Sequence, residues 1–261
     1  MPGIPSIVQD GVHCEPPSGI NVLVVGAGVG GLTAALECYR KGHTVCVIER
    51  SPSAAAAGKS FHSHHVRCQP DHGIAGDQFT IGLSGRRWIS HYPAMKAELD
   101  RISITNRMQY FQWTGETIGE PFAMKAIGMQ PHLAELMKDG PPMSMQMRPL
   151  FHRMLLHQLR RFGIEVLYGR RAVLYWESNE NGKGCVMTDQ GERFEADLVL
   201  AADGLHSKSR DVVLGGQGSG KPSGQSLFRC AVPLDKVMHD PLVKEQLGLD
   251  DGKPMMRAFI G

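Results

Sequence analysis

The sequence feature that most constrains the fold is a glycine-rich turn at residues 26–31 (GAGVGG). The preceding residues 20–25 (INVLVV) form a near-continuous β-branched run, which predicts a parallel strand buried on both faces. Apolar side chains then recur at helical spacing over residues 32–39, and Gly42 follows as a helix stop. A second buried strand is predicted over residues 44–48 (TVCVI). The turn therefore lies inside a β-turn-α-β unit.

Three glycines of this turn, Gly26, Gly28 and Gly31, match the spacing of a dinucleotide-binding fingerprint. In that fingerprint the first glycine permits a tight turn, the second lets the backbone approach a pyrophosphate, and the third lets the helix lie close to the strand. Glu49 follows about 20 residues later, where a carboxylate accepts hydrogen bonds from a ribose. We therefore expect an ADP-containing cofactor, NAD or FAD, at this turn. The alternative is a tight turn that binds no ligand.

The composition favours a globular protein that binds a small molecule. The chain has 261 residues, of which 42% are hydrophobic, and it contains no apolar run of about 18 residues that could span a membrane. This length predicts one large α/β domain or two interleaved domains. The formal net charge is +2 and neither sign forms a long block, so the sequence predicts no nucleic-acid partner. The six cysteines form no CxxC pair and the N-terminus lacks a signal-peptide pattern, which predicts a cytoplasmic location.

Other stretches predict one long helix, a shorter one and several strands. Residues 149–162 carry apolar side chains at helical spacing, with Pro149 in the first turn and Gly163 as the stop. A shorter helix is predicted over residues 93–102. Residues 1–19, which are rich in proline and glycine, predict a flexible leader. Strands are predicted at residues 108–113, 164–168, 172–176, 185–188, 193–196, 198–202 and 255–261.

Three segments resemble the flavin-dependent aromatic hydroxylases, the class A monooxygenases related to salicylate hydroxylase and p-hydroxybenzoate hydroxylase. The first is residues 24–32 (VVGAGVGGL) together with residues 48–50 (IER). The second, residues 148–156 (RPLFHRMLL), is similar to the family's RxxL helix start, although Phe151 stands in the leucine place. The third, residues 196–210 (ADLVLAADGLHSKSR), is similar to the family's DG segment. Their order and spacing also agree with the family.

The resemblance implies an α/β fold: a doubly wound, Rossmann-like FAD-binding domain with an antiparallel crossover sheet and an interleaved, incomplete substrate domain. It implies that residues 20–77 and 131–222 form the FAD-binding domain, and that residues 78–130 and 223–261 form part of the substrate domain. The residues that the resemblance and the fingerprint together place at FAD are Gly26, Gly28, Gly31, Glu49, Arg50, Arg148, Asp203 and Gly204.

The implied activity is hydroxylation of an aromatic or polyketide-like small molecule of secondary metabolism, with FAD as cofactor and NAD(P)H and O₂ as co-substrates. Arg210 follows the DG segment and Arg229 lies in residues 227–233 (LFRCAVP). A guanidinium can pair with a carboxylate or phenolate, so both arginines are candidates for orienting an anionic or phenolic substrate. A surface salt bridge is the alternative role for each of them.

Two departures from the family leave other functions open. The chain ends at residues 255–261 (MMRAFIG), before the family's GD segment, and residues 51–77 differ from the family's shorter loop. We therefore expect a chain truncated at its C-terminus, for which a non-catalytic remnant that binds the ADP half of FAD or nothing is one alternative. An NAD-dependent dehydrogenase is another alternative, although the sequence has no YxxxK motif.

Two motif-like segments predict no site. Residues 53–60 and 215–222 approach a P-loop, but Ser53 stands where the turn needs glycine and Pro222 stands where Mg²⁺ needs a hydroxyl. A third segment is rich in potential zinc ligands, but its spacing matches no zinc-finger pattern, so no metal site is predicted. Its residues are His62, His64, His65, Cys68 and His72.

Overall fold

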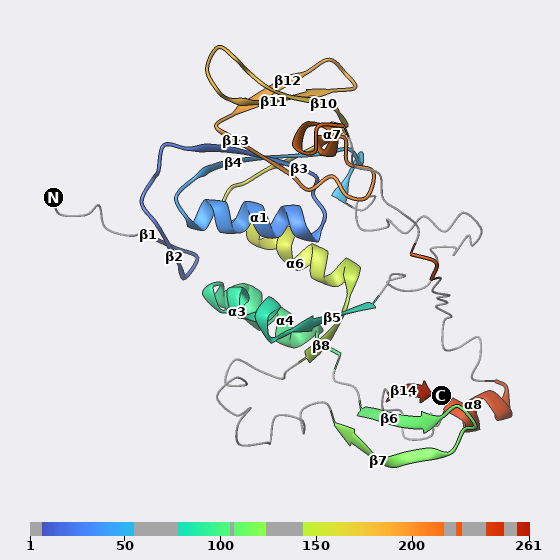
Figure 1. Ribbon diagram of the computed structural model, residues 1–261. Coiled ribbons are helices and arrows are strands. Elements are labelled where there is room, and N and C mark those ends of the chain that lie inside the picture. Colours follow the sequence, from blue (N-terminus) through green and yellow to red (C-terminus); the bar gives the residue numbers. More distant parts are fainter. Residues whose placement is uncertain are drawn as a thin grey trace. The chain divides into compact units, whose positions relative to one another are not determined.

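A computed structural model describes residues 7–54, 78–104, 107–123, 143–216, 223–225, 239–247 and 255–261. The chain forms two compact units, each assembled from segments that are separated in the sequence (Figure 1). The first unit consists of Met1–Gly76, His91–Ile102 and Met147–Lys221. The second consists of Asp77–Ser90, Ser103–Gln146 and Pro222–Gly261.

The first unit is built around a four-stranded parallel sheet in the order β13-β3-β4-β9. Its strands are β3 (Asn21–Val25), β4 (Thr44–Glu49), β9 (Val166–Tyr168) and β13 (Leu198–Ala201). Each of them overlaps a stretch that the hydrophobic pattern predicts as a strand, and β4 extends one residue further, to Glu49. The last four residues of β3 are buried, as expected for a strand covered on both faces.

Helices cover one face of this sheet in successive layers (Figure 1). Helix α1 (Val29–Arg40) packs on the sheet, α6 (Arg148–Arg161) packs on α1, and α4 (Pro93–Ile102) packs on α6. Gly42 follows α1 with a φ of 82°, a left-handed conformation that favours glycine and ends the helix. The predicted helices over 32–39, 93–102 and 149–162 are therefore confirmed, with bounds that agree within three residues.

An antiparallel sheet covers the other face of the parallel sheet (Figure 1). Its strands are β10 (Ala172–Glu177), β11 (Gly184–Thr188) and β12 (Arg193–Ala196). Leu23 and Ile48 from the parallel sheet form one core with Tyr175 and Val186 from the antiparallel sheet. The expected α/β class with a crossover sheet is confirmed, whereas the doubly wound detail is not, since the described helices cover only one face.

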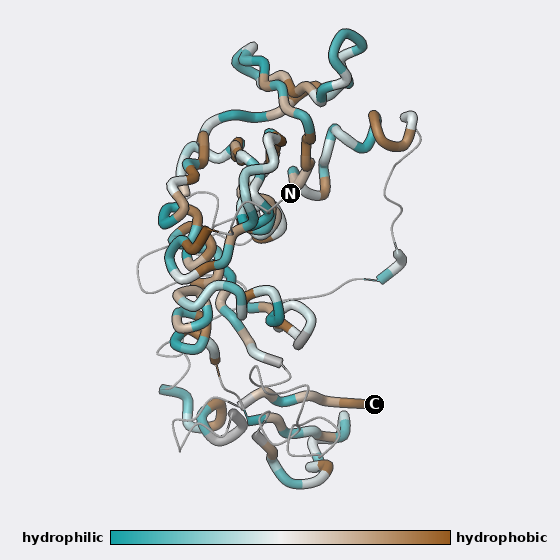
Figure 2. The backbone as a smooth tube through the Cα atoms, turned by 90° about the vertical axis from the view of Figure 1, so that its left-hand side faces the viewer, coloured by the Kyte–Doolittle hydropathy of each residue, from teal (hydrophilic) through white to brown (hydrophobic). Residues whose placement is uncertain are grey.

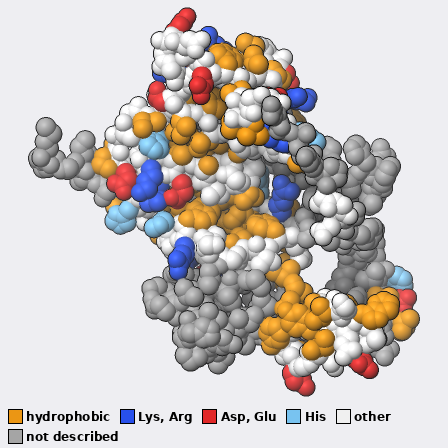
Figure 3. Space-filling view, in the orientation of Figure 1, with side chains coloured by type: hydrophobic (Ala, Val, Ile, Leu, Met, Phe, Trp, Pro, Cys, Tyr) orange, Lys and Arg blue, Asp and Glu red, His pale blue; other side chains and the backbone are white. Residues whose placement is uncertain are grey.

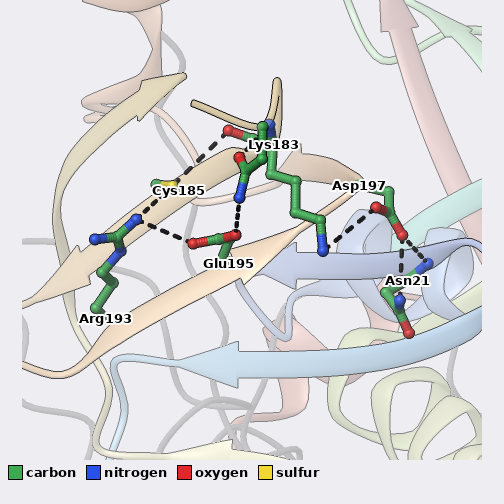
Figure 4. Close-up of polar contacts among 7 residues, drawn as sticks. Asn21, Lys183, Cys185, Arg193, Glu195 and Asp197 are labelled. Carbon is green, nitrogen blue, oxygen red and sulfur yellow. Dashed lines mark hydrogen bonds and ion pairs between the residues drawn. The ribbon is translucent and has the colours of Figure 1, made fainter. Parts of the chain in front are cut away.

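Asp197 connects the two sheets at the start of β3 (Figure 4). One oxygen of its carboxylate accepts hydrogen bonds from the backbone N–H and the side-chain amide of Asn21, at 2.8 and 3.1 Å. The other lies 3.8 Å from the ammonium of Lys183. The backbone hydrogen bond from Asn21 is the main reason that the pKa of Asp197 is lowered. The carboxylate therefore fixes the register between β13 and β3 at their amino ends.

Helix α7 (Ser209–Val213) follows β13 and packs near β10. It exposes hydrophobic side chains, of which Val213 is the most exposed. In Figure 2 its end is the brown stretch at the upper right. Val173 and Leu174 of β10 are also exposed. Hydrophobic side chains accordingly reach the surface on the face that Figure 3 shows.

Of the helices in the described ranges, none is long and apolar enough to cross a membrane.

The second unit contains two small sheets and short helices. In one sheet β5 (Gln78–Gly82) pairs with β8 (Met143–Met147). In the other, β6 (Arg107–Gln112) lies between β7 (Thr117–Ala123), which is antiparallel to it, and β14 (Met255–Ile260), which is parallel to it. The helical segments are α3 (Leu83–Arg87), the 3-10 helix Trp88–His91 and α8 (Pro241–Leu247).

The expectation of a flexible leader before residue 20 is wrong for its described part. Strands β1 (Ile7–Gln9) and β2 (Val12–Cys14) form a hairpin whose turn is Asp10–Gly11, both with positive φ. An Asp-Gly pair is a strong hairpin signal, which the high proline and glycine content of the segment obscured. The hairpin is held against the helices because Tyr39 of α1 donates a 2.7 Å hydrogen bond to Gln9.

Burial of the hairpin predicts that Val12 contributes to stability. Its side chain is fully buried, whereas Val8 of the same hairpin is 58% exposed. Val12→Ala should lower the free energy of unfolding by about 1–3 kcal/mol, because it removes buried methyl groups and leaves a cavity. Val8→Ala should change it by less than about 0.5 kcal/mol. Urea unfolding followed by circular dichroism would measure both, and equal effects would show that the hairpin is not docked.

Candidate functional site

Three predicted site segments meet at the carboxyl edge of the parallel sheet. The glycine turn follows β3, Glu49 is the last residue of β4, and Asp203 follows β13. Backbone hydrogen bonds of 2.8 Å hold them together: the N–H of Gly26 donates to Ile48, and the N–H of Ala202 donates to Val25. Ligands of open α/β sheets bind at this edge, so the fold brings the sequence-predicted residues to one place.

The glycines of the turn differ in whether the surrounding backbone leaves room for a side chain. A Cβ on Gly26 would lie 2.5 Å from the carbonyl oxygen of Ala202, and a Cβ on Gly31 would lie 1.8 Å from the carbonyl oxygen of Gly26. These two glycines are required by the close packing of the turn, the helix and the DG segment. Gly28 differs, since a Cβ there would meet no atom of the described residues within 4 Å and its φ of −72° suits any residue. The space beside Gly28 is therefore open to a ligand.

Glu49 is buried and already engaged with the backbone around it. Its Oε2 accepts a 2.7 Å hydrogen bond from the N–H of Ala27, and its Oε1 accepts a 2.8 Å hydrogen bond from the N–H of Ser51. A carboxylate has about four acceptor positions, so each oxygen retains a second one. Glu49 therefore orients the glycine turn and can still accept a hydrogen bond from a ligand hydroxyl.

Asp203 carries a buried oxygen without a partner. Its Oδ2 accepts a 2.8 Å hydrogen bond from the hydroxyl of Tyr175, whereas its Oδ1 is buried and has no hydrogen-bond partner among the described residues. Burial, followed by this hydrogen bond to Asp203, raises the pKa of Tyr175. A buried unpaired oxygen is costly, which is typical of a position that a ligand donor completes.

The remaining predicted residues have mixed surroundings. Arg148 is the first residue of α6 and is partly buried, whereas Arg50 is exposed just after β4. Gly204 follows Asp203 with a φ of 88°, a conformation that favours glycine. Arg210 donates a hydrogen bond to the carbonyl oxygen of Leu205 in its own segment. Arg229 lies outside the described residues.

No group of three potential metal ligands occurs within the described ranges. The histidine-rich segment over residues 61–72 falls outside them, as do most residues of the two P-loop-like segments.

Two residues that the sequence reasoning missed also belong to this site. Tyr175 lies on β10 of the crossover sheet and contacts Asp203 from there. His152 lies on α6 and its Nε2 is 2.7 Å from the carbonyl oxygen of Ala27 in the glycine turn. The only sequence signal for His152 is its place one helical turn after Arg148.

Similarity to known proteins agrees with this geometry. Residues 21–116 match the family model described as FAD dependent oxidoreductase. The FAD-dependent monooxygenase fsr3 of Gibberella fujikuroi is 35% identical over 247 residues, which is 94% of this chain and 44% of that protein. The FAD-dependent monooxygenase dmxR9 of a Cryptosporiopsis species is 36% identical over 249 residues, with 95% and 44% covered. The chain is related to the FAD-dependent monooxygenases.

This relation confirms the family resemblance of the three sequence segments, and the chain spans about 44% of the length of these two monooxygenases. A solved structure, described as CtdE in complex with FAD and substrate 4, superposes with a TM-score of 0.57 at 27% identity. The match covers 76% of this chain and 41% of that one.

The packing of the glycine turn predicts that alanine substitutions at two neighbouring glycines change the free energy of unfolding by different amounts. Gly31→Ala should lower the free energy of unfolding by about 3 kcal/mol or more, because the new methyl group would overlap the backbone of Gly26. Gly30→Ala is the matched control: a Cβ there meets nothing within 4 Å, and alanine favours a helix by up to about 1 kcal/mol. Denaturant unfolding of both variants measures the difference, and similar stabilities would contradict the packing argument.

The raised pKa of Tyr175 predicts a pH dependence of stability. The folded protein keeps this phenol protonated near pH 10, where the unfolded chain releases the proton, so its contribution is complete below about pH 10 and declines above it. Tyr175→Phe should lower the free energy of unfolding at pH 7 by about 1–3 kcal/mol, because it leaves Asp203 without a donor.

The same variant should flatten the decline of stability above about pH 10. The pKa of Tyr92 is also raised, but Tyr92 is present in both proteins and contributes equally to both curves. Identical slopes for the two proteins would contradict the assignment of the titration to Tyr175.

Proposed function

We propose that this chain binds FAD and that the protein is a monooxygenase, which hydroxylates an aromatic or polyketide-like small molecule with NAD(P)H and O₂. The observation that carries the proposal is the meeting of an open glycine position, a buried glutamate and a half-satisfied aspartate at one sheet edge. The relation to FAD-dependent monooxygenases supports the choice of FAD over NAD.

The first half of the site fits the ADP part of FAD. Gly28 precedes the first turn of α1, whose backbone N–H groups carry partial positive charge, and it leaves space for a pyrophosphate. Glu49 keeps an acceptor position on each oxygen, which fits a ribose hydroxyl. A negatively charged carboxylate at this position would repel a 2′-phosphate, which disfavours NADP at this site.

The second half fits the ribityl or flavin part of the cofactor. The Oδ1 of Asp203 is an acceptor that a ligand hydroxyl or ring N–H would satisfy. Arg148, at the start of α6, can donate to ring or phosphate oxygens, and Gly204 allows the close approach of the chain. Arg50 is exposed beside Glu49, where it would stay near the adenosine.

FAD supplies the redox chemistry when it is bound, and the chain's own residues hold it and exclude water. The glycine turn and Glu49 bind the adenosine half, and Asp203, held by Tyr175, accepts a hydrogen bond from the other half. We further propose that residues 78–130 and 223–261 contribute to the substrate domain. Arg210 and Arg229 are the candidates for pairing with an anionic or phenolic substrate.

Purification followed by an absorbance scan tests for bound flavin, and Gly28→Val tests the site. Valine would fill the open position beside the turn without strain on the fold, so FAD and ADP affinity should become undetectable in calorimetric titration while the free energy of unfolding stays within about 1 kcal/mol of the wild type.

Thr33→Val is the matched control, because it introduces a similar side chain further along α1 and should leave FAD affinity unchanged. A folded Gly28→Val protein that retains FAD would overturn the pyrophosphate assignment. A wild-type chain that binds neither FAD nor ADP would overturn the proposed cofactor.

A further inference from the structure

His152 is a buried polar side chain that the proposed function leaves unused. It is 5% exposed, and its Nε2 lies 2.7 Å from the carbonyl oxygen of Ala27. A carbonyl oxygen can only accept, so Nε2 carries the proton and donates. The bond joins α6 to the glycine turn across 125 positions of sequence.

Both backbone groups of Ala27 are therefore held by side chains from other elements. Glu49 at the end of β4 accepts from its N–H, and His152 on α6 donates to its carbonyl oxygen. The carbonyl of Ala27 belongs to the peptide group that supplies the N–H of Gly28. Holding this peptide plane fixes the direction of the first N–H beside the open position.

His152 also links the glycine turn to the part of α6 that carries Arg148. The two residues are four positions apart on α6, so they lie on one side of the helix about one turn from each other. A hydrogen bond from His152 to the turn therefore sets the position of the helix start that carries Arg148.

We propose that His152 is a positioning residue of the cofactor site, which orients the Ala27–Gly28 peptide and sets the place of α6 against the glycine turn. This inference rests on the proposed FAD binding and names a residue that acts on affinity without touching the cofactor.

The test compares three variants of the full chain. His152→Leu removes the donor, and His152→Gln retains an amide N–H that can reach the same carbonyl. His157→Leu is the matched control, because His157 lies on the same helix but pairs with Glu98 at 3.2 Å and makes no hydrogen bond to the described residues of the turn. The measurements are FAD and ADP affinity by calorimetric titration, and amide hydrogen exchange of residues 24–32 without ligand.

His152→Leu should weaken FAD and ADP binding about tenfold, the factor that corresponds to about 1.4 kcal/mol, and should accelerate exchange in the turn. His152→Gln should restore most of the affinity, and His157→Leu should match the wild type in both measurements. A solely structural role for His152 would lower the folded fraction but leave the affinity of the folded protein unchanged.

The outcomes separate this inference from the proposed function. If the wild type binds FAD and His152→Leu changes neither affinity nor exchange, the role of His152 is wrong and the FAD site stands. If His152→Leu accelerates exchange but the wild type binds neither FAD nor ADP, the proposed function is wrong and the positioning of a cofactor falls with it.

Discussion

The first unit depends on a steric constraint at one point, where the glycine turn, helix α1 and the segment after β13 meet. The carbonyl oxygen of Gly26 occupies the position that a side chain on Gly31 would need, and the carbonyl oxygen of Ala202 occupies the position that a side chain on Gly26 would need. Two missing side chains thus let three backbone segments approach one another. The consequence is that Asp203, which follows Ala202, lies beside the turn and not at a separate edge of the sheet.

The two carboxylates at this edge serve different purposes because their surroundings differ. Glu49 accepts hydrogen bonds from two backbone N–H groups, so its charge is compensated before any ligand binds. Asp203 receives one hydrogen bond from Tyr175, and its other oxygen is buried with no hydrogen-bond partner in the described part of the chain. The first arrangement favours a fixed turn, whereas the second stores an unfavourable desolvation that a ligand donor can relieve.

Local patterns in the sequence predicted most of the first unit. Strands β3 and β4, helix α1 and the turn between them follow from hydrophobic period and glycine spacing, which depend on neighbours within a few positions. The hairpin before them was missed because the Asp10–Gly11 pair lies in a proline- and glycine-rich segment that favours a flexible interpretation. The strand patterns alone did not predict which element covers the second face of the sheet. Hydrophobic periodicity identifies single strands, but it does not specify which strands pair with one another.

The side chains that complete the site were beyond sequence reasoning for a related cause. Tyr175 and Asp203 are 28 positions apart, and His152 and Ala27 are 125 positions apart, so no spacing rule connects them. Each pair joins the glycine-turn edge to a different layer, the crossover sheet in one case and α6 in the other. The layers on both faces of the parallel sheet are therefore not only supports for the core. Each contributes one hydrogen-bond donor to the same edge, so the geometry of the proposed cofactor site depends on the packing of the whole first unit.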